Sequence, residues 1–140
     1  MSDAIVAAAR SAIGARFRVH GRDPAYGLDC VGLVALAVRA GGVTTIVPND
    51  YALRSGDADA VAAMIAAAGL VTAHAPGAGD VLLCRPGPGQ LHLVIDGGVR
   101  RDHPPGSIIH ADAQLRRVVE RPGPPPWPVI GRWRIPNAEE

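Results

Sequence analysis

The sequence predicts an α+β domain in which N-terminal helices pack on a C-terminal antiparallel β-sheet of about five strands. Apolar residues recur at helical spacing in the first half of the chain, and after Gly77 the pattern changes to short β-rich stretches separated by Gly or Pro. Helices followed by consecutive strands are typical of this class. The 140 residues fit a single domain, 1–140, and 48% apolar residues suffice for a core.

Three stretches that end at glycines are expected to be helices: residues 2–13, 30–39 and 58–68. Ser2 or Asp3 can cap the first, and Asp57 can cap the third. The second is apolar around most of its circumference, which predicts a buried helix. Between the first two, Gly21, Pro24 and Gly27 indicate a loop over residues 16–28.

Five stretches are predicted to be strands: residues 81–84, 91–96, 107–110, 115–121 and 129–135. In the second of them, Leu91, Leu93 and Ile95 alternate with His92, so His92 should point to the opposite face from the leucines. Residues 122–128 form a proline-rich connector that is too short to separate two domains.

Composition and charge exclude several classes of protein. A net charge of +1 argues against a nucleic-acid binder, and no apolar run approaches the 18 or so residues of a membrane span. Cys30 and Cys84 lack C-x-x-C or zinc-ligand spacing, so neither a disulfide scaffold nor a metal site is expected, and no cofactor is implied. The first residues lack the basic segment of a signal peptide, so we expect synthesis in the cytoplasm.

Cys30 is the most informative residue because it lies where a glycine-containing loop becomes a helix. Unpaired N–H groups and the helix dipole at that position favour a thiolate, and the same N–H groups can hold an oxyanion. Gly27 and Gly32 would let a substrate backbone approach. The alternative is that Cys30 is a small buried apolar residue, as free cysteines often are.

A thiolate nucleophile needs a base, and the base needs an orienting partner. If the strands that contain His92 and His110 form a hairpin, the two imidazoles can lie opposite each other within reach. A Cys–His–polar triad can then be assembled. A single histidine in a small domain is more often structural, so the triad hypothesis depends on the pairing of the two histidines.

Four segments, in this order, resemble the NlpC/P60 family of cell-wall cysteine peptidases. They are the stretch Tyr-Gly-Leu-Asp-Cys-Val-Gly-Leu-Val (26–34), Gly-Asp-Val-Leu (79–82), Leu-His-Leu-Val-Ile (91–95) and Ile-Ile-His-Ala (108–111), preceded by the upstream loop at residues 13–17 and Gly21. The resemblance covers roughly residues 5–135. It implies a papain-like fold and hydrolysis of peptidoglycan stem peptides, of the type between D-glutamate and a diamino acid.

The resemblance also implies the role of individual residues. Cys30 corresponds to the nucleophile, His92 to the general base and His110 to the orienting residue, while Asp29 matches an aspartate that pairs with the free amine of the stem peptide. Asp29 can instead, or in addition, be the N-cap of the Cys30 helix. Asp80 is interpreted as structural.

Two departures from the family pattern affect the site. Phe17 stands where the family usually carries a tyrosine whose hydroxyl lies near the active site, and His20 or Tyr26 are candidates to compensate. His103 competes with His110 for the third catalytic position. Because two prolines follow His103 and remove ladder donors, we expect that segment to be a loop and favour His110.

The C-terminal stretch over residues 122–133 resembles peptidases encoded in phage and gene-transfer-agent tail clusters. This implies tail hub or tip proteins as partners, and action at the cell wall or periplasm as part of a virion-like particle, with Trp127 and Trp133 as candidate anchors unless they pack on the sheet. One alternative is a structural tail component that keeps the fold with weak or no catalysis. Another is an acyltransferase or amidase on the same scaffold.

Overall fold

The computed structural model describes residues 2–44, 57–100 and 103–136. Its helices and strands confirm the predicted α+β fold class. Within these ranges there are three helices, α1 (Ser2–Ser11), α2 (Cys30–Ala40) and α3 (Ala58–Ala67). The strands are β1 (Arg22–Asp23), β2 (Gly27–Leu28), β3 (Val71–Thr72), β4 (Val81–Cys84), β5 (His92–Arg100), β6 (His103–Asp112), β7 (Arg117–Pro122) and β8 (Val129–Arg134). No helix in the described ranges is long and apolar enough to cross a membrane.

The large sheet has six antiparallel strands in the order β3-β8-β4-β5-β6-β7. Five of these strands are the ones that the sequence predicts. The sixth, β3, is only two residues long and pairs through Val71 with Arg134 of β8. A two-residue strand leaves no alternation to detect, which explains why it is absent from the prediction.

The segment expected to be a loop over residues 16–28 contains a small hairpin. Its strands β1 and β2 pair through Arg22 and Leu28, and isolated bridges join Phe17 to Leu28 and Arg16 to Arg117 of β7. This loop is therefore attached both to the start of α2 and to the edge of the large sheet.

The expectation of a loop at His103 is wrong, because β6 already begins at that residue. The ladder between β6 and β7 starts only at Ser107, so among the described strands the first part of β6 pairs with β5 alone. Proline is tolerated on a strand that has a free side, since no ladder donor is lost there. The rule that prolines exclude a strand therefore fails at the start of β6.

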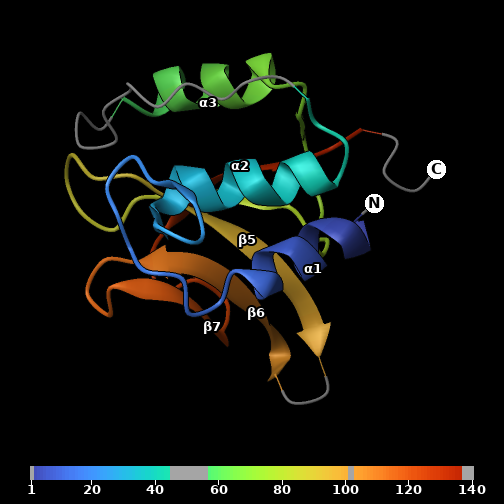
Figure 1. Ribbon diagram of the computed structural model, residues 1–140. Coiled ribbons are helices and arrows are strands. Elements are labelled where there is room, and N and C mark those ends of the chain that lie inside the picture. Colours follow the sequence, from blue (N-terminus) through green and yellow to red (C-terminus); the bar gives the residue numbers. More distant parts are fainter. Residues whose placement is uncertain (1, 45–56, 101–102, 137–140) are drawn as a thin grey trace.

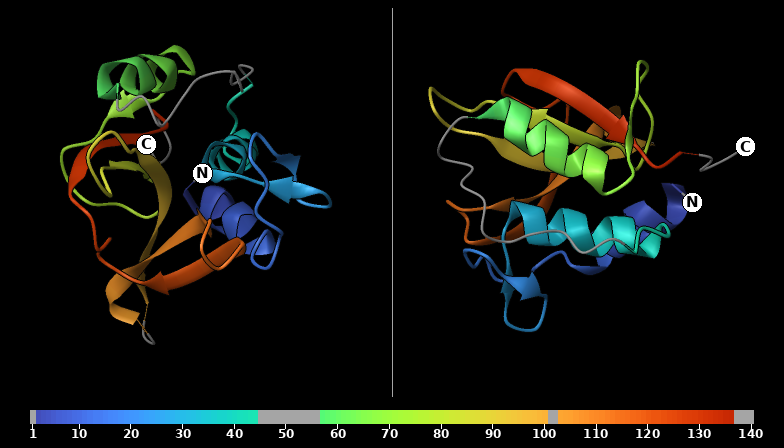
Figure 2. Two further views of the ribbon diagram at one scale, coloured as in Figure 1. Left: turned by 90° about the vertical axis from the view of Figure 1, so that its left-hand side faces the viewer. Right: turned by 90° about the horizontal axis from the view of Figure 1, so that it is seen from above.

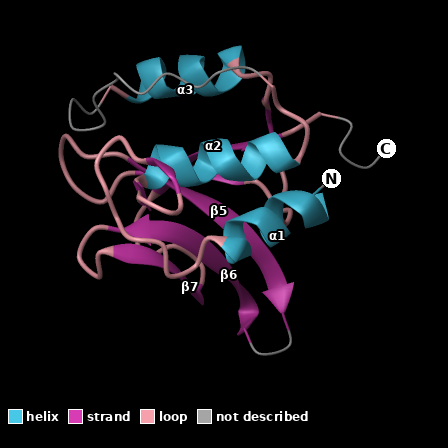
Figure 3. Cartoon of the chain, viewed as in Figure 1, coloured by secondary structure: helices cyan, strands magenta, loops and turns pink. Residues whose placement is uncertain are grey.

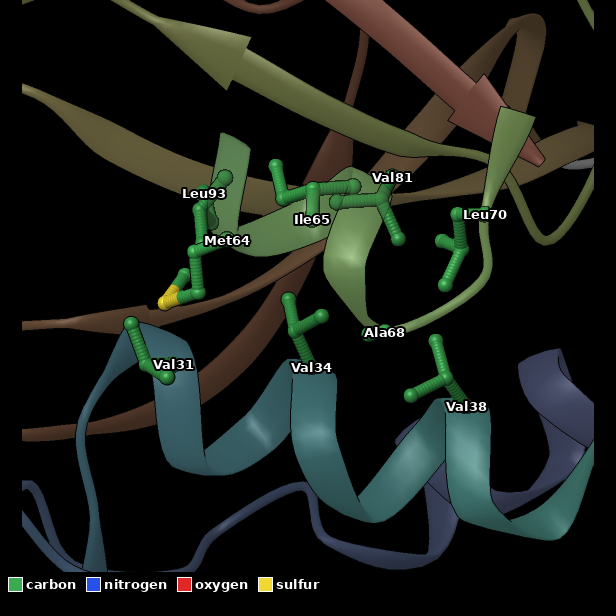
Figure 4. A pocket seen from close by; sticks show the side chains of 9 residues that line it. All are labelled: Val31, Val34, Val38, Met64, Ile65, Ala68, Leu70, Val81 and Leu93. Carbon is green, nitrogen blue, oxygen red and sulfur yellow. The ribbon is translucent and has the colours of Figure 1, made fainter. Parts of the chain in front are cut away.

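Helices α1, α2 and α3 all lie on one face of the sheet. Helix α2 lies against β5 and β6 and helix α1 lies against β5, while α3 lies beside α2 on the side away from α1 (Figures 1 and 3). Views from the side and from above show the sheet curving around the α1–α2 pair (Figure 2). Figure 4 shows where α2, α3 and the sheet meet, a space lined entirely by apolar side chains: Val31, Val34, Val38, Met64, Ile65, Ala68, Leu70, Val81 and Leu93.

The opposite face of the central strands is also apolar. Leu82, Cys84, Val94 and Ile108 form a second buried cluster, and Trp127 of the proline-rich connector packs against it. The main cluster, between the sheet and the helices, contains Leu91, Leu93, Ile95 and Trp133. Since Val94, which shares a face with His92, lies in the second cluster, the predicted alternation along β5 is confirmed.

Trp133 is 8% exposed and belongs to the main core. Its packing on the sheet, one of the two alternatives considered from the sequence, is the one observed, so Trp133 is not a surface anchor. Trp127 is partly exposed, but its ring also packs on the sheet.

Asp80 is buried at the start of β4 and accepts hydrogen bonds from two arginines. Arg134 donates from Nε and Nη2, each over 2.8 Å, and Arg132 donates from Nη1 over 2.8 Å while also bonding Asp96 over 2.9 Å. Because the acid is paired and fully hydrogen-bonded, its burial is tolerated. The cluster ties β8 to β4 and β5.

Gly32, in the first turn of α2, is packed directly against the upstream loop. A Cβ atom at this position would overlap the carbonyl oxygen of Gly21, and one at Gly27 would contact the side chain of Arg18. The expectation that these glycines admit a substrate backbone is therefore wrong. The space is already filled by the chain itself, and the contact fixes the loop onto the helix.

Gly32→Ala should destabilise the protein by about 1–3 kcal/mol, because the added methyl forces the loop away from α2. Gly87→Ala is the matched control, since its added Cβ meets only the flexible Gln90 side chain, and it should change stability by less than about 0.5 kcal/mol. Urea unfolding measures both. Equal stability of the two variants would contradict the packing described for Gly32.

Candidate active site

Asp29 fixes the start of α2 and one point of the upstream loop. Its Oδ1 accepts from the backbone N–H of Gly32 over 2.8 Å, which makes it the N-cap of the helix, and its Oδ2 accepts from the N–H of His20 over 2.8 Å. His20 has a φ of +61°, in the left-handed region that non-glycine residues seldom adopt. The capping role predicted from the sequence is confirmed.

Cys30 follows Asp29 and is only 4% exposed. The pKa of its thiol is raised to about 12, mainly by burial and in smaller part by the Asp29 carboxylate. The backbone N–H groups of Leu93, Val31 and Cys30 itself act in the opposite direction and lower the pKa, but they do not prevail. The expectation of a resting thiolate is therefore wrong, because desolvation outweighs the helix N-terminus.

His92 and His110 form a directly bonded pair. His92 Nε2 lies 2.9 Å from His110 Nδ1, and the rings meet edge to face with centroids 5.0 Å apart. The register of β5 and β6 joins Ile95 to Ile109, so the two histidines are diagonal neighbours and not directly opposite. Diagonal positions are still within reach of long side chains, and the predicted pairing through a hairpin is confirmed.

Both imidazoles are neutral at rest. The pKa of His92 is lowered to about 4, mainly by burial and also by proximity to His110, while Asp112 opposes the shift. Burial also lowers the pKa of His110, which Asp112 opposes and Arg121 reinforces. The resting site therefore holds a neutral thiol and two neutral imidazoles.

Trp127 covers the histidine pair. Its ring meets that of His92 edge to face at 5.3 Å and that of His110 at 5.6 Å. From the sequence, Trp127 is expected either to anchor a partner or to pack on the sheet, and its position over the two histidines is not predicted. No periodic pattern points to this position, because Trp127 lies in an irregular connector.

The structure brings Cys30 close to the backbone of the histidine strand. The N–H that acts on the Cys30 sulfur belongs to Leu93, the residue that follows His92. Among the hydrogen bonds described, none joins the Cys30 sulfur to the His92 ring. His110 occupies the position beside His92, and the side chain of His103 lies outside the described residues.

Other residues considered from the sequence lie around this centre. Phe17 is partly buried against the main core and supplies no hydroxyl, and Tyr26 is 69% exposed in the turn between β1 and β2. Cys84 pairs across the sheet with His92 but is buried in the second cluster, and burial raises the pKa of its thiol to about 11. The described residues contain no group of three or more His, Cys, Asp or Glu side chains suited to a metal ion.

Two solved structures share this fold. The NlpC/p60 domain of the peptidoglycan hydrolase SagA aligns with 24% identity and a TM-score of 0.57, over 87% of this chain and 89% of that domain. The peptidoglycan hydrolase RipB from Mycobacterium tuberculosis aligns with 23% identity and a TM-score of 0.61, over 96% of this chain and 64% of that one. No family model matches the sequence, and no curated protein does. The likeness establishes an α+β fold of the NlpC/p60 type.

The depressed pKa of His92 makes the stability of the fold depend on pH. Between pH 6.5 and 4 the unfolded chain binds a proton at His92 that the folded chain does not, so stability is complete above pH 6.5 and declines as the pH falls. The unfolding free energy should drop by about 2 kcal/mol between pH 7 and 5, and His110 should add to the loss.

Urea unfolding at the two pH values measures this loss, and His92→Gln is the control because it removes the ionising group at His92. The loss should be clearly smaller in His92→Gln than in the wild-type chain. An identical loss in both would show that His92 is not buried in its neutral form.

Proposed function

We propose that this chain is a cysteine hydrolase that cleaves peptide bonds in peptidoglycan, with Cys30 as nucleophile, His92 as general base and His110 as orienting residue. The observation that carries the proposal is the bonded His92–His110 pair at the start of β5, next to the residue whose N–H acts on the Cys30 sulfur. The two solved structures that share the fold are described as peptidoglycan hydrolases, which supports this choice of substrate.

The neutral resting site determines how the reaction proceeds. Because the thiol is protonated, His92 removes its proton while the sulfur attacks the substrate carbonyl, instead of meeting a preformed thiolate. The oxyanion is held by backbone N–H groups of the first turn of α2, among which that of Cys30 already faces the sulfur. His92 then protonates the leaving amine, and water hydrolyses the thioester to release the acid.

For the position of cleavage we propose the bond between D-glutamate and the diamino acid of the stem peptide, with Asp29 facing the free amine. Each Asp29 oxygen accepts one backbone N–H and retains a second acceptor direction, so the capping role leaves capacity for an ammonium group. Phe17 contributes no hydroxyl to this site.

A structural tail component with weak or no catalysis is the second candidate function. The observation that favours it is the burial of Cys30, a residue that is 4% exposed and whose thiol is protonated at rest. Catalysis requires substrate to reach a sulfur that is covered in this conformation. Hydrolysis of peptidoglycan separates the two candidates directly.

Cys30→Ala should reduce the release of muropeptides from purified peptidoglycan to background, because the nucleophile is indispensable. Loss of one buried sulfur should cost only about 1–2 kcal/mol, so the variant should remain folded. Cys84→Ala is the matched control: it removes an equally buried thiol that faces the second cluster and should retain activity. Mass spectrometry of the released fragments identifies the bond that is cut.

The histidine variants test the assignment of the base. His92→Ala should be as inactive as Cys30→Ala, His110→Ala should show a milder loss, and His103→Ala should be close to wild type. Activity in Cys30→Ala together with inactivity in Cys84→Ala would show that Cys84, and not Cys30, is the nucleophile. Wild-type protein that releases no muropeptide would leave the structural candidate in place.

We further propose that the chain acts within a phage-like tail that opens the cell wall for DNA delivery, together with tail hub or tip proteins. The resemblance of residues 122–133 to tail-associated peptidases supports this context. Since Trp133 is buried, the exposed apolar side chains of Val129 and Ile130 on β8 replace it as candidate docking residues.

The chain should therefore be found by mass spectrometry in intact particles purified from the producing cell. Val129→Asp together with Ile130→Asp should remove it from the particles while muropeptide release by the isolated protein is retained. Its detection only as free protein, with particles that deliver DNA normally in its absence, would contradict the tail role and leave the peptidase proposal untouched.

A further inference from the structure

The proposed triad uses the Nδ1 atom of His110 but not its other ring nitrogen, Nε2. His110 is 1% exposed, and its Nε2 is a buried nitrogen without a hydrogen-bond partner among the described residues. The nearest carboxylate is that of Asp112, whose Oδ2 lies 3.9 Å from this nitrogen. Buried polar atoms are nearly always paired, so an unpaired nitrogen that faces a carboxylate points to a functional arrangement.

Asp112 is held so that only one of its oxygens can face His110. Its Oδ1 accepts the backbone N–H groups of Gln114 and Leu115 over 2.8 and 3.0 Å, in the turn between β6 and β7. This fixes the plane of the carboxylate and leaves Oδ2 toward the imidazole. The gap is about 1 Å longer than a hydrogen bond, and contacts of this kind tighten when a positive charge develops beside them.

The carboxylate selects one tautomer of His110. With a proton on Nε2, the imidazole presents an N–H to Asp112, whereas the other tautomer would set a nitrogen lone pair against a carboxylate oxygen. The Nε2–H tautomer leaves His110 Nδ1 as an acceptor, so His92 must donate from Nε2 across the 2.9 Å contact. His92 Nδ1 then carries the lone pair that a general base needs.

We propose that Asp112 is a positioning residue which fixes the tautomers of His110 and His92 and thereby keeps His92 ready to accept a proton. Its effect on catalysis rests on the proposed hydrolase, whereas its effect on the tautomers does not. Arg121 of β7 is the other charged group that acts on His110, and its positive charge opposes protonation of the ring. Asp112 counterbalances it when His92 and His110 share the positive charge of the transition state.

Asp112→Asn tests this inference. The Asn Oδ1 can keep the two turn hydrogen bonds, which places the amide NH₂ where Oδ2 was and turns a donor toward His110 Nε2. His110 should then carry its proton on Nδ1 and donate to His92, which loses the free lone pair on Nδ1. In serine-protease triads, the same change from carboxylate to amide traps the histidine in the wrong tautomer. We expect kcat to fall by about 10–100-fold with KM little changed.

The first readout needs no substrate. Long-range ¹H–¹⁵N correlation spectra at pH 7 report which nitrogen of each imidazole is protonated, and they should show Nε2–H for His110 in the wild type and Nδ1–H in Asp112→Asn. Asp57→Asn is the matched control, because Asp57 also accepts a backbone N–H, at the start of α3, and lies outside the site. It should leave both tautomers and kcat unchanged.

Nδ1–H on His110 in the wild type, or an unchanged tautomer in Asp112→Asn, would overturn the inference. A changed tautomer with kcat within twofold of wild type would overturn its catalytic part. If the tautomer changes as expected while the wild-type protein hydrolyses no peptidoglycan, Asp112 keeps its positioning role and the proposed function fails. The two results are therefore distinguishable.

Discussion

The central strands β4 and β5 are apolar on both faces, and each face must be covered for the sheet to exist in water. Helices α1 and α2 cover one face and place the start of α2 near the beginning of β5. The proline-rich connector covers the other face through Trp127, which lies over His92 and His110. The position of the thiol and of the histidine pair thus follows from how the two faces of one sheet are buried.

The same burial determines the charge state of the candidate site. Desolvation raises the pKa of Cys30 and lowers those of His92 and His110, so each group is neutral at rest. A neutral site avoids the cost of burying an unpaired charge. In the reaction proposed above, charge appears only when a proton passes from sulfur to imidazole, and the backbone N–H groups around the sulfur and the carboxylate of Asp112 are the groups proposed to stabilise it.

Much of this arrangement is predictable from local sequence patterns. Alternation along residues 91–96 placed His92 on the face opposite to Leu93, and the position of Asp29 before an apolar helix predicted its capping role. The pairing of His92 with His110 followed from two strands that could form a hairpin, although their diagonal offset depends on register, which the sequence does not define. These predictions succeed because they rest on side-chain periodicity and on helix-end chemistry.

The failures share a different origin. The charge state of Cys30 depends on how deeply the sulfur is buried, the fit of Gly32 depends on a loop folded back from Gly21, and the role of Trp127 depends on the path of an irregular connector. The strand at His103 depends on which side of β6 has a neighbour. Each is set by contacts between segments distant in the chain, which no local pattern encodes.

The division of the site between the two halves of the chain affects how the protein is made. The thiol belongs to a helix synthesised early, whereas the imidazoles belong to the strands β5 and β6 that follow, and the tryptophan above them belongs to the later connector before β8. A ribosome-bound or truncated chain that ends before β6 therefore contains the sulfur but not the histidine pair. In the proposed mechanism, acid–base assistance to the thiol becomes available only once the late strands have joined the early helices, so the completeness of folding would itself control when this centre can act.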